Sequence, residues 1–243
     1  RHRGPPALLA AGLDPEAGWL LPSPALRRIP TAQTSFDVDH DGVVRRLSTT
    51  KQLGAVSLTA LPVAAVALGP AKPPPVAVGR VLVPDFRSRP RSVPIVSASD
   101  LLSGRGGRAL AGRIVFLGAT AAGLGDRYVT PGSPAGTPEP GVLVHAATTA
   151  CLLSGGLLAR TSPLVSGLLA AAFAALVLLA ARAGRRRLLR GFAALVPPAG
   201  GTVLLAAGLE LPIVTLSGTT LIALLAVEAR FARHGQAQAT HLA

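Results

Sequence analysis

The sequence contains a single cysteine, no methionine and only 3% aromatic residues. The lone Cys151 cannot form a disulfide within the chain, so a disulfide-stabilised scaffold is excluded. The lack of methionine implies that Arg1 is not a natural start, and we expect a fragment, a processed product or a misread frame. Charged residues make up only 14% and hydrophobic residues 49%, which excludes intrinsic disorder.

Acidic residues are also scarce, with 11 Asp and Glu against 24 Lys and Arg, for a net charge of +13. A strongly basic chain raises the question of nucleic-acid binding. The basic residues are dispersed, however, and the aromatic side chains on which bases stack are nearly absent. We therefore predict no nucleic-acid partner.

Three long runs without any charged residue fill the C-terminal third, at residues 163–181, 191–209 and 211–227. A run of about 20 residues at 1.5 Å per residue matches a hydrocarbon core roughly 30 Å thick. A buried helix of a soluble protein is the alternative, but it accounts for one shorter run rather than three. We predict a bundle of three transmembrane helices at 163–181, 191–209 and 211–229.

The orientation follows from the loop at residues 182–190, which contains five arginines. Short arginine-rich loops stay in the cytoplasm. Three spans then place the tail at 230–243, which contains Arg230 and Arg233, on the same cytoplasmic side. Residues 1–162 are predicted to be extracytoplasmic, in a multi-pass protein of the inner (plasma) membrane.

The pattern of residues 1–162 predicts a mixed α/β domain. Residues 1–30 are rich in proline and are expected to be irregular. The remaining expected elements are a hairpin at 36–47, a core helix within 54–68, buried strands at 76–86 and 113–118, a short helix after Ser97 and a helix at 141–154 with Leu143, Ala147, Ala150 and Cys151 on one face.

The predicted hairpin carries three alternating aspartates, of which Asp39 and Asp41 precede Gly42. This resembles the opening of a calcium loop, but the twelfth position, which should be glutamate, is Ser48. We interpret Asp39, Asp41 and Gly42 as a structural turn, with a cation site as the alternative, and predict no metal.

A glycine-rich loop follows the expected strand at 113–118, as phosphate loops do. It lacks the lysine and the glycine spacing of known nucleotide sites, so a nucleotide site stays an alternative and no cofactor is predicted. Asp126, Arg127 and His145 are the polar groups whose setting suggests a shared site. An outward-facing enzyme using Asp126 and His145 is the least supported alternative, because no nucleophile and base pair is evident, and we predict no catalytic residue.

Several strings occur in the order of a known pattern. They are GRIVFLGATAAGLGDRYVTP at 112–131, PGVLVHAATTACLLSGG at 140–156 and DHDGVVRR at 39–46. Together they resemble the second type of CHASE domain, an extracellular sensor associated with cyclases and histidine kinases. The resemblance covers about residues 30–158, and three membrane helices after the domain fit the family's layout.

The resemblance implies a sensor that binds an extracellular small molecule or protein and signals to a cytoplasmic cyclase or kinase output, in cis or in trans. The candidate ligand-binding residues are Thr120, Asp126, Arg127, Thr130 and His145. The family's Asn after His-Ala is Ala147 here, and its Glu before the His is replaced by Leu143 or Val144.

The family's N-terminal membrane helix, its first strand–helix units and its output domain are expected to be missing, so the sensor domain would be incomplete. We therefore expect isolated residues 1–162 to aggregate or to stay partly unfolded. A stand-alone membrane protein that acts as a structural or assembly partner is the alternative function, and homodimer formation is left open.

Overall fold

The chain forms two units in a computed structural model, Arg1–Leu157 (unit 1) and Leu158–Ala243 (unit 2). Each unit is described by itself. The structure describes residues 6–14, 16–69, 79–87, 93–121, 123, 126–182, 200, 202, 209–210, 218–223, 225–226 and 229.

Unit 1 begins with a three-stranded sheet of β1 (Leu9–Asp14), β2 (Gly18–Leu20) and β3 (Thr31–Gln33), in the order β2-β1-β3. Strand β2 is antiparallel to β1 and β3 is parallel to it. Asp14 closes the β1–β2 turn, because its carboxylate accepts two backbone hydrogen bonds. The expectation of an irregular segment at 1–30 was therefore wrong for these strands.

The second part of unit 1 is antiparallel. Strands β4 (Asp37–Val38), β5 (Val44–Ser48) and β8 (Val81–Leu82) form one small sheet in that order. Strands β6 (Thr50–Leu53) and β7 (Val56–Thr59) form a separate hairpin. Only two residues of the strand predicted at 76–86 lie in a strand, and residues 76–78 of that prediction lie outside the described residues.

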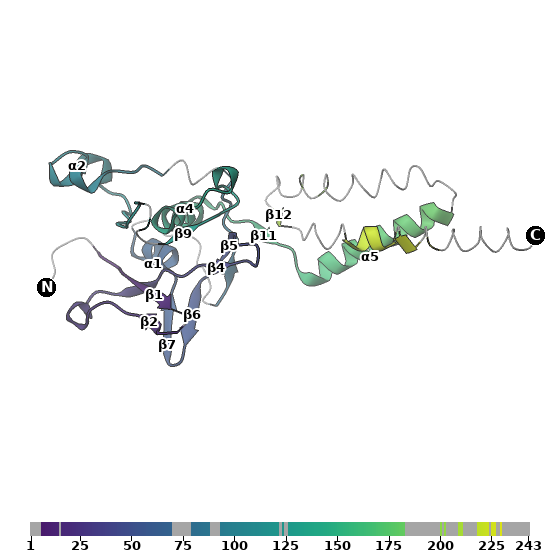
Figure 1. Cartoon of the computed structure of the whole chain (residues 1–243), viewed down its shortest axis with the longest axis horizontal. Helices are drawn as coiled ribbons and strands as arrows, with labels where there is room; N and C mark the ends of the chain where they lie inside the picture. Colours follow the sequence, from purple (N-terminus) through teal and green to yellow (C-terminus); the bar gives the residue numbers. More distant parts are fainter. Residues whose placement is uncertain are drawn as a thin grey trace, which may run out of the picture. The chain divides into compact units, whose positions relative to one another are not determined.

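Two helices pack side by side in unit 1, α1 (Leu61–Leu68) and α4 (Gly141–Ser154) (Figure 1). Shorter elements complete it: the 3-10 turns η1 (Pro24–Leu26) and η3 (Pro134–Gly136), helices α2 (Ala98–Leu102) and α3 (Gly107–Leu110), and the antiparallel pair β9 (Arg127–Tyr128) and β10 (Glu139–Pro140). The core cluster consists of Phe36, Val44, Leu47, Ala60, Phe86, Val144 and Ala147. The prediction of a mixed α/β domain is confirmed.

Helix α4 has the predicted bounds but a different buried face. It ends at Gly155, whose φ of 70° places it in the left-handed region that glycine adopts without strain. Its buried residues are Gly141, Val144, His145, Ala147, Thr148, Thr149, Cys151 and Leu152. The face is thus centred on Val144, Thr148 and Cys151, while Leu143 and Ala150 are only half-buried.

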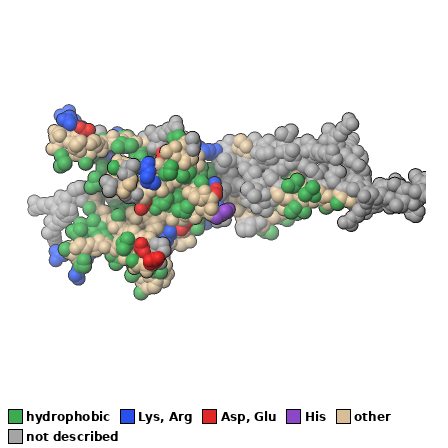
Figure 2. Space-filling model, in the orientation of Figure 1, with side chains coloured by type: hydrophobic (Ala, Val, Ile, Leu, Met, Phe, Trp, Pro, Cys, Tyr) green, Lys and Arg blue, Asp and Glu red, His purple; other side chains and the backbone are tan. Residues whose placement is uncertain are grey.

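Residues 113–118 do not form the predicted buried strand. They contain no strand, and the side chains of Val115 and Leu117 are 53% and 90% exposed. The β-branched composition predicts a strand, but burial also needs a neighbouring strand, and none pairs with this segment among the described residues. Figure 2 shows hydrophobic side chains on the visible surface of unit 1.

Unit 2 contains β11 (Ala159–Arg160), α5 (Pro163–Arg182) and β12 (Leu209–Glu210), and β12 is parallel to β11. Helix α5 exposes Leu164, Val165, Leu168, Leu176, Leu178 and Leu179.

Within the described part of the chain, no helix meets the length and hydropathy needed to cross a bilayer. The Arg-rich loop was predicted at 182–190; Arg182 is the last residue of α5, and residues 183–190 lie outside the described residues. Most of the segments predicted at 191–209 and 211–229, and the tail at 230–243, also lie outside them.

Candidate ligand-binding site beside helix α4

The start of helix α4 is fixed against strand β9. The Gly141 backbone N–H donates to the Asp126 carbonyl at 2.8 Å. A Cβ at Gly141 would lie 3.1 Å from the Tyr128 ring and 3.4 Å from the Asp126 Cβ. Glycine thus allows β9 to approach the first turn of the helix closely.

Three rings pack beneath this junction. The Phe36 and His145 rings stack with centroids 4.4 Å apart, and the Tyr128 ring meets Phe36 edge-on at 5.0 Å. Such offset and edge-on pairs are worth about 0.5–1.5 kcal/mol beyond their buried area. Phe36 and Tyr128 were not among the predicted site residues, although aromatic residues make up only 3% of the chain and their scarcity was a signal.

His145 is buried rather than presented to solvent. Its Nε2 lies 3.1 Å from the Thr34 carbonyl oxygen. A carbonyl can only accept, so Nε2 carries the proton and donates. Its Nδ1 has no hydrogen-bond partner among the described residues. Burial lowers the pKa of His145 to about 4, so the ring is neutral at physiological pH.

Tyr128 contacts Phe36 through its ring and lies beside the Asp126 carboxylate. Burial and the neighbouring Asp126 carboxylate raise the pKa of the Tyr128 hydroxyl to about 12, because both disfavour a phenolate. The hydroxyl therefore stays protonated and can act only as a neutral hydrogen-bonding group.

Thr130 belongs to a turn just beyond β9 and is buried, with 3% of its surface exposed. Its backbone N–H donates to the Ser133 hydroxyl at 2.9 Å, and that hydroxyl in turn donates to the Glu139 carboxylate at 2.9 Å. The Thr130 hydroxyl accepts from the Gly132 N–H. The backbone N–H and the hydroxyl of Thr130 are therefore engaged in hydrogen bonds that stabilise the loop between β9 and β10.

The five candidate residues do not converge on one cavity. Asp126, Arg127 and Thr130 lie on β9 and its flanks, but only Asp126 and Arg127 are exposed. The Arg127 guanidinium donates to the Pro138 carbonyl at 2.6 Å and so clamps the loop. His145 lies in the core, and Thr120 is exposed at the end of the segment that follows α3. Of the residues on β9 and its flanks, Asp126 and Arg127 are thus the two whose side chains reach the surface.

The Asp-Gly turn between β4 and β5 is held by one arginine. The Arg45 guanidinium makes paired hydrogen bonds to the Asp41 carboxylate at 2.8 and 2.7 Å and a third to Asp39 at 3.0 Å. Gly42 has a φ of 81°, as the turn requires. The Arg45 hydrogen bonds hold the pKa of Asp41 down at about 2. No cluster of three metal-ligating side chains occurs in the described residues.

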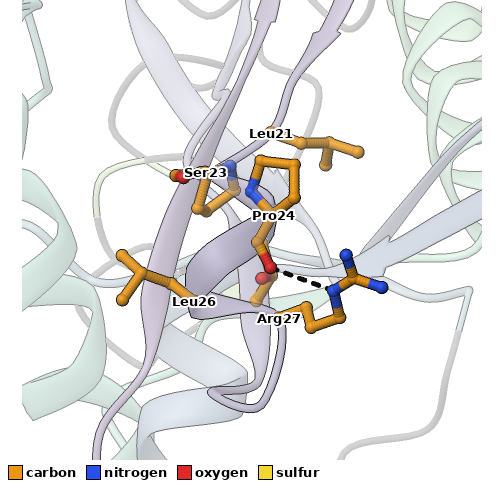
Figure 3. A pocket seen from close by; sticks show the side chains of 7 residues that line it. Leu21, Ser23, Pro24, Leu26 and Arg27 are labelled. Carbon is orange, nitrogen blue, oxygen red and sulfur yellow. Dashed lines mark hydrogen bonds between the residues drawn. The ribbon is translucent and has the colours of Figure 1, made fainter.

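A cavity of about 340 Å³ lies in a region that the sequence analysis treated as irregular (Figure 3). Its lining residues are Leu21, Pro22, Ser23, Pro24, Leu26, Arg27 and Thr31. Arg27 Nε donates to the Pro24 carbonyl at 3.0 Å, which fixes the guanidinium beside the apolar wall. The cavity follows from η1 folding back after β2. The available signal was Ser23 followed directly by Pro24, since serine is a favoured N-cap residue and proline is favoured at the first helical position.

Unit 1 is an α/β domain, and unit 2 contains the apolar helix α5. The family model of the CHASE2 domain matches residues 15–181, which is about two thirds of the chain. The chain therefore belongs to the CHASE2 family. CHASE2 domains are extracellular sensor modules of bacterial receptors that carry cytoplasmic outputs. Neither the curated proteins nor the solved structures gave a match.

Proposed function

We propose that the chain is the input module of a membrane-bound receptor, in which unit 1 senses a small molecule or protein outside the cytoplasm and transmembrane helices carry the signal to a cyclase or kinase. The family match carries this proposal. The proposed role is binding and transmission rather than catalysis, because His145 is buried in the ring cluster and is not presented to a substrate.

The proposed topology has spans at 163–181, 191–209 and 211–229, with loop 182–190 inside. For the first span, the support comes from the exposed leucines of α5, which are Leu164, Leu168, Leu176, Leu178 and Leu179. Exposed leucines are stable where lipid replaces water as the surrounding medium. The parallel pairing of β11 with β12 gives further support, since β11 directly precedes α5 and Glu210 precedes the third proposed span.

The proposed ligand contacts are the exposed Asp126 and Arg127, with Thr120 at the margin. Thr130 and His145 are proposed to position this surface, Thr130 through the loop hydrogen bonds and His145 through the ring stack on Phe36. If a bound ligand displaces β9, the displacement would be transmitted to α4 through the hydrogen bond from the Gly141 N–H to the Asp126 carbonyl. Helix α4 leads through β11 into α5 along the chain.

Transmission can be tested without knowing the ligand. The full chain is fused after Ala243 to a cyclase domain, and one to four alanines are inserted after Arg230. Each alanine rotates the downstream helix by about 100°. We expect basal cyclase activity to rise and fall with helical phase by roughly fivefold or more, the scale of a typical coupling energy.

The control places the same alanines in a flexible glycine–serine linker after Ala243, where no phase effect is expected. A flat response to insertions at both places contradicts transmission through the helix. It would favour the alternative of a membrane protein that serves as an assembly partner.

A further inference from the structure

Residues 113–118 form an open strand-like segment on the surface of unit 1. None of residues 114–120 lies in a helix, turn or bend. Exposure alternates along the segment, with Ile114 and Phe116 half-buried while Val115 and Leu117 are exposed. This is the period of two that a strand has when one face packs on a domain.

The backbone of this segment has no pairing partner in the part of the chain that the structure describes. No backbone hydrogen bond of residues 114–118 is formed with any other described residue. A row of unpaired N–H and C=O groups beside apolar side chains is a template for another strand. Peptide recognition by strand addition uses these two features, the main-chain bonds for affinity and alternate side chains for specificity.

The segment is held in place at both ends. The Ile114 side chain reaches Gly69 at the end of α1, where a Cβ would lie 3.1 Å from its Cδ1. At the other end Gly118 lies against Val142 of α4, so closely that a Cβ would be 2.7 Å from the valine side chain. A fixed template lowers the entropy cost of adding a strand.

The charge beside the segment indicates the kind of strand it accepts. Arg113 begins the segment and Arg108 lies in α3, and both are exposed. Neither has an ion-pair partner among the described residues, whereas nearby Arg105 pairs with Asp100. A strand with an acidic flank would complement Arg108 and Arg113. A second copy of this chain would not, because each copy has a net charge of +13.

We propose that residues 113–118 are a docking site for an extended, β-branched strand with acidic flanking residues, supplied by a partner polypeptide. The strand adds to the free backbone of 114–118, packs on Val115 and Leu117, and places its acidic residue near Arg108 and Arg113. A lipid surface is the poorer occupant, because lipid cannot hydrogen-bond the free backbone groups. The proposal does not depend on the signalling role.

The test uses the full chain in phosphatidylcholine nanodiscs and a short labelled peptide that alternates valine and threonine between terminal glutamates. We expect saturable binding by fluorescence polarisation and slower amide hydrogen exchange at 114–118. A peptide N-methylated at alternate residues should not bind, because its side chains remain but its donors are lost. Arg108→Gln with Arg113→Gln should weaken binding by about fivefold.

Leu117→Glu supplies a matched pair with Leu102→Glu in α2, because both leucines are 90% exposed and neither change should disturb folding. We expect only Leu117→Glu to abolish peptide binding. Equal binding of the N-methylated peptide, or equal effects of the two variants, would overturn the proposal. So would exchange protection that rises with protein concentration alone, which indicates a second copy, or protection that requires anionic vesicles, which indicates lipid.

Discussion

Replacing Phe36 with alanine is expected to destabilise unit 1 by about 3–5 kcal/mol. Phe36 is 7% exposed, stacks on His145 and receives the edge of Tyr128. Truncation removes both ring contacts and leaves a cavity between β4 and α4. The expected result is a large loss because the ring joins the strand region to the helix that carries the proposed signal.

The chain's single tryptophan, Trp19, lies in unit 1 and reports the unfolding of that unit in the full chain. Urea titration of Trp19 fluorescence in nanodiscs would measure the loss of stability. Phe36→Leu, which keeps most of the buried volume, is the control and should cost about 1 kcal/mol. A loss below that value for Phe36→Ala would show that the three-ring cluster does not stabilise the domain.

Acidification is expected to destabilise unit 1 through His145. The pKa of its imidazole is about 4 in the folded chain, against 6.5 for an unperturbed histidine. Between these values the unfolded chain binds a proton that the folded chain cannot, so stability is constant above pH 6.5 and falls as the pH drops toward 4. The full difference is about 3 kcal/mol.

His145→Gln provides the comparison, since its amide can donate to the Thr34 carbonyl but does not titrate. The difference in unfolding free energy between wild type and His145→Gln, followed by Trp19 fluorescence from pH 7.5 to 4 in the full chain, should change with pH. Aspartates such as Asp37 titrate in both proteins and cancel in the difference. A difference that is independent of pH would mean that His145 is accessible to protons in the folded chain.

The positions of several helices and turns could be predicted from residues at their own ends. Gly155 ends α4, Gly42 marks the β4–β5 turn, and the Ser97 hydroxyl accepts the Ser99 N–H at the start of α2. In each of these elements the deciding contact lies within a few residues of the signal. Short-range chemistry therefore predicted their positions.

Long-range contacts decided the rest. The segment at 113–118 has the composition of a buried strand, but the sequence does not say whether a neighbouring strand is there to cover it. His145 was considered as a ligand contact, and its burial depends on Phe36 and on Thr34, which is 111 positions away. The exposed pair Asp126 and Arg127 was predicted, while the ring cluster beneath it was not.

In the proposed topology, unit 1 faces outward and loop 182–190 faces the cytoplasm. Single cysteines test it directly in a Cys151→Ala background, with Ala25→Cys in the exposed part of unit 1 and Arg186→Cys in the predicted inner loop. A membrane-impermeant maleimide applied to intact spheroplasts should label Ala25→Cys at once and Arg186→Cys only after lysis. Labelling of Arg186→Cys in intact spheroplasts, or protection of Ala25→Cys until lysis, would contradict the account.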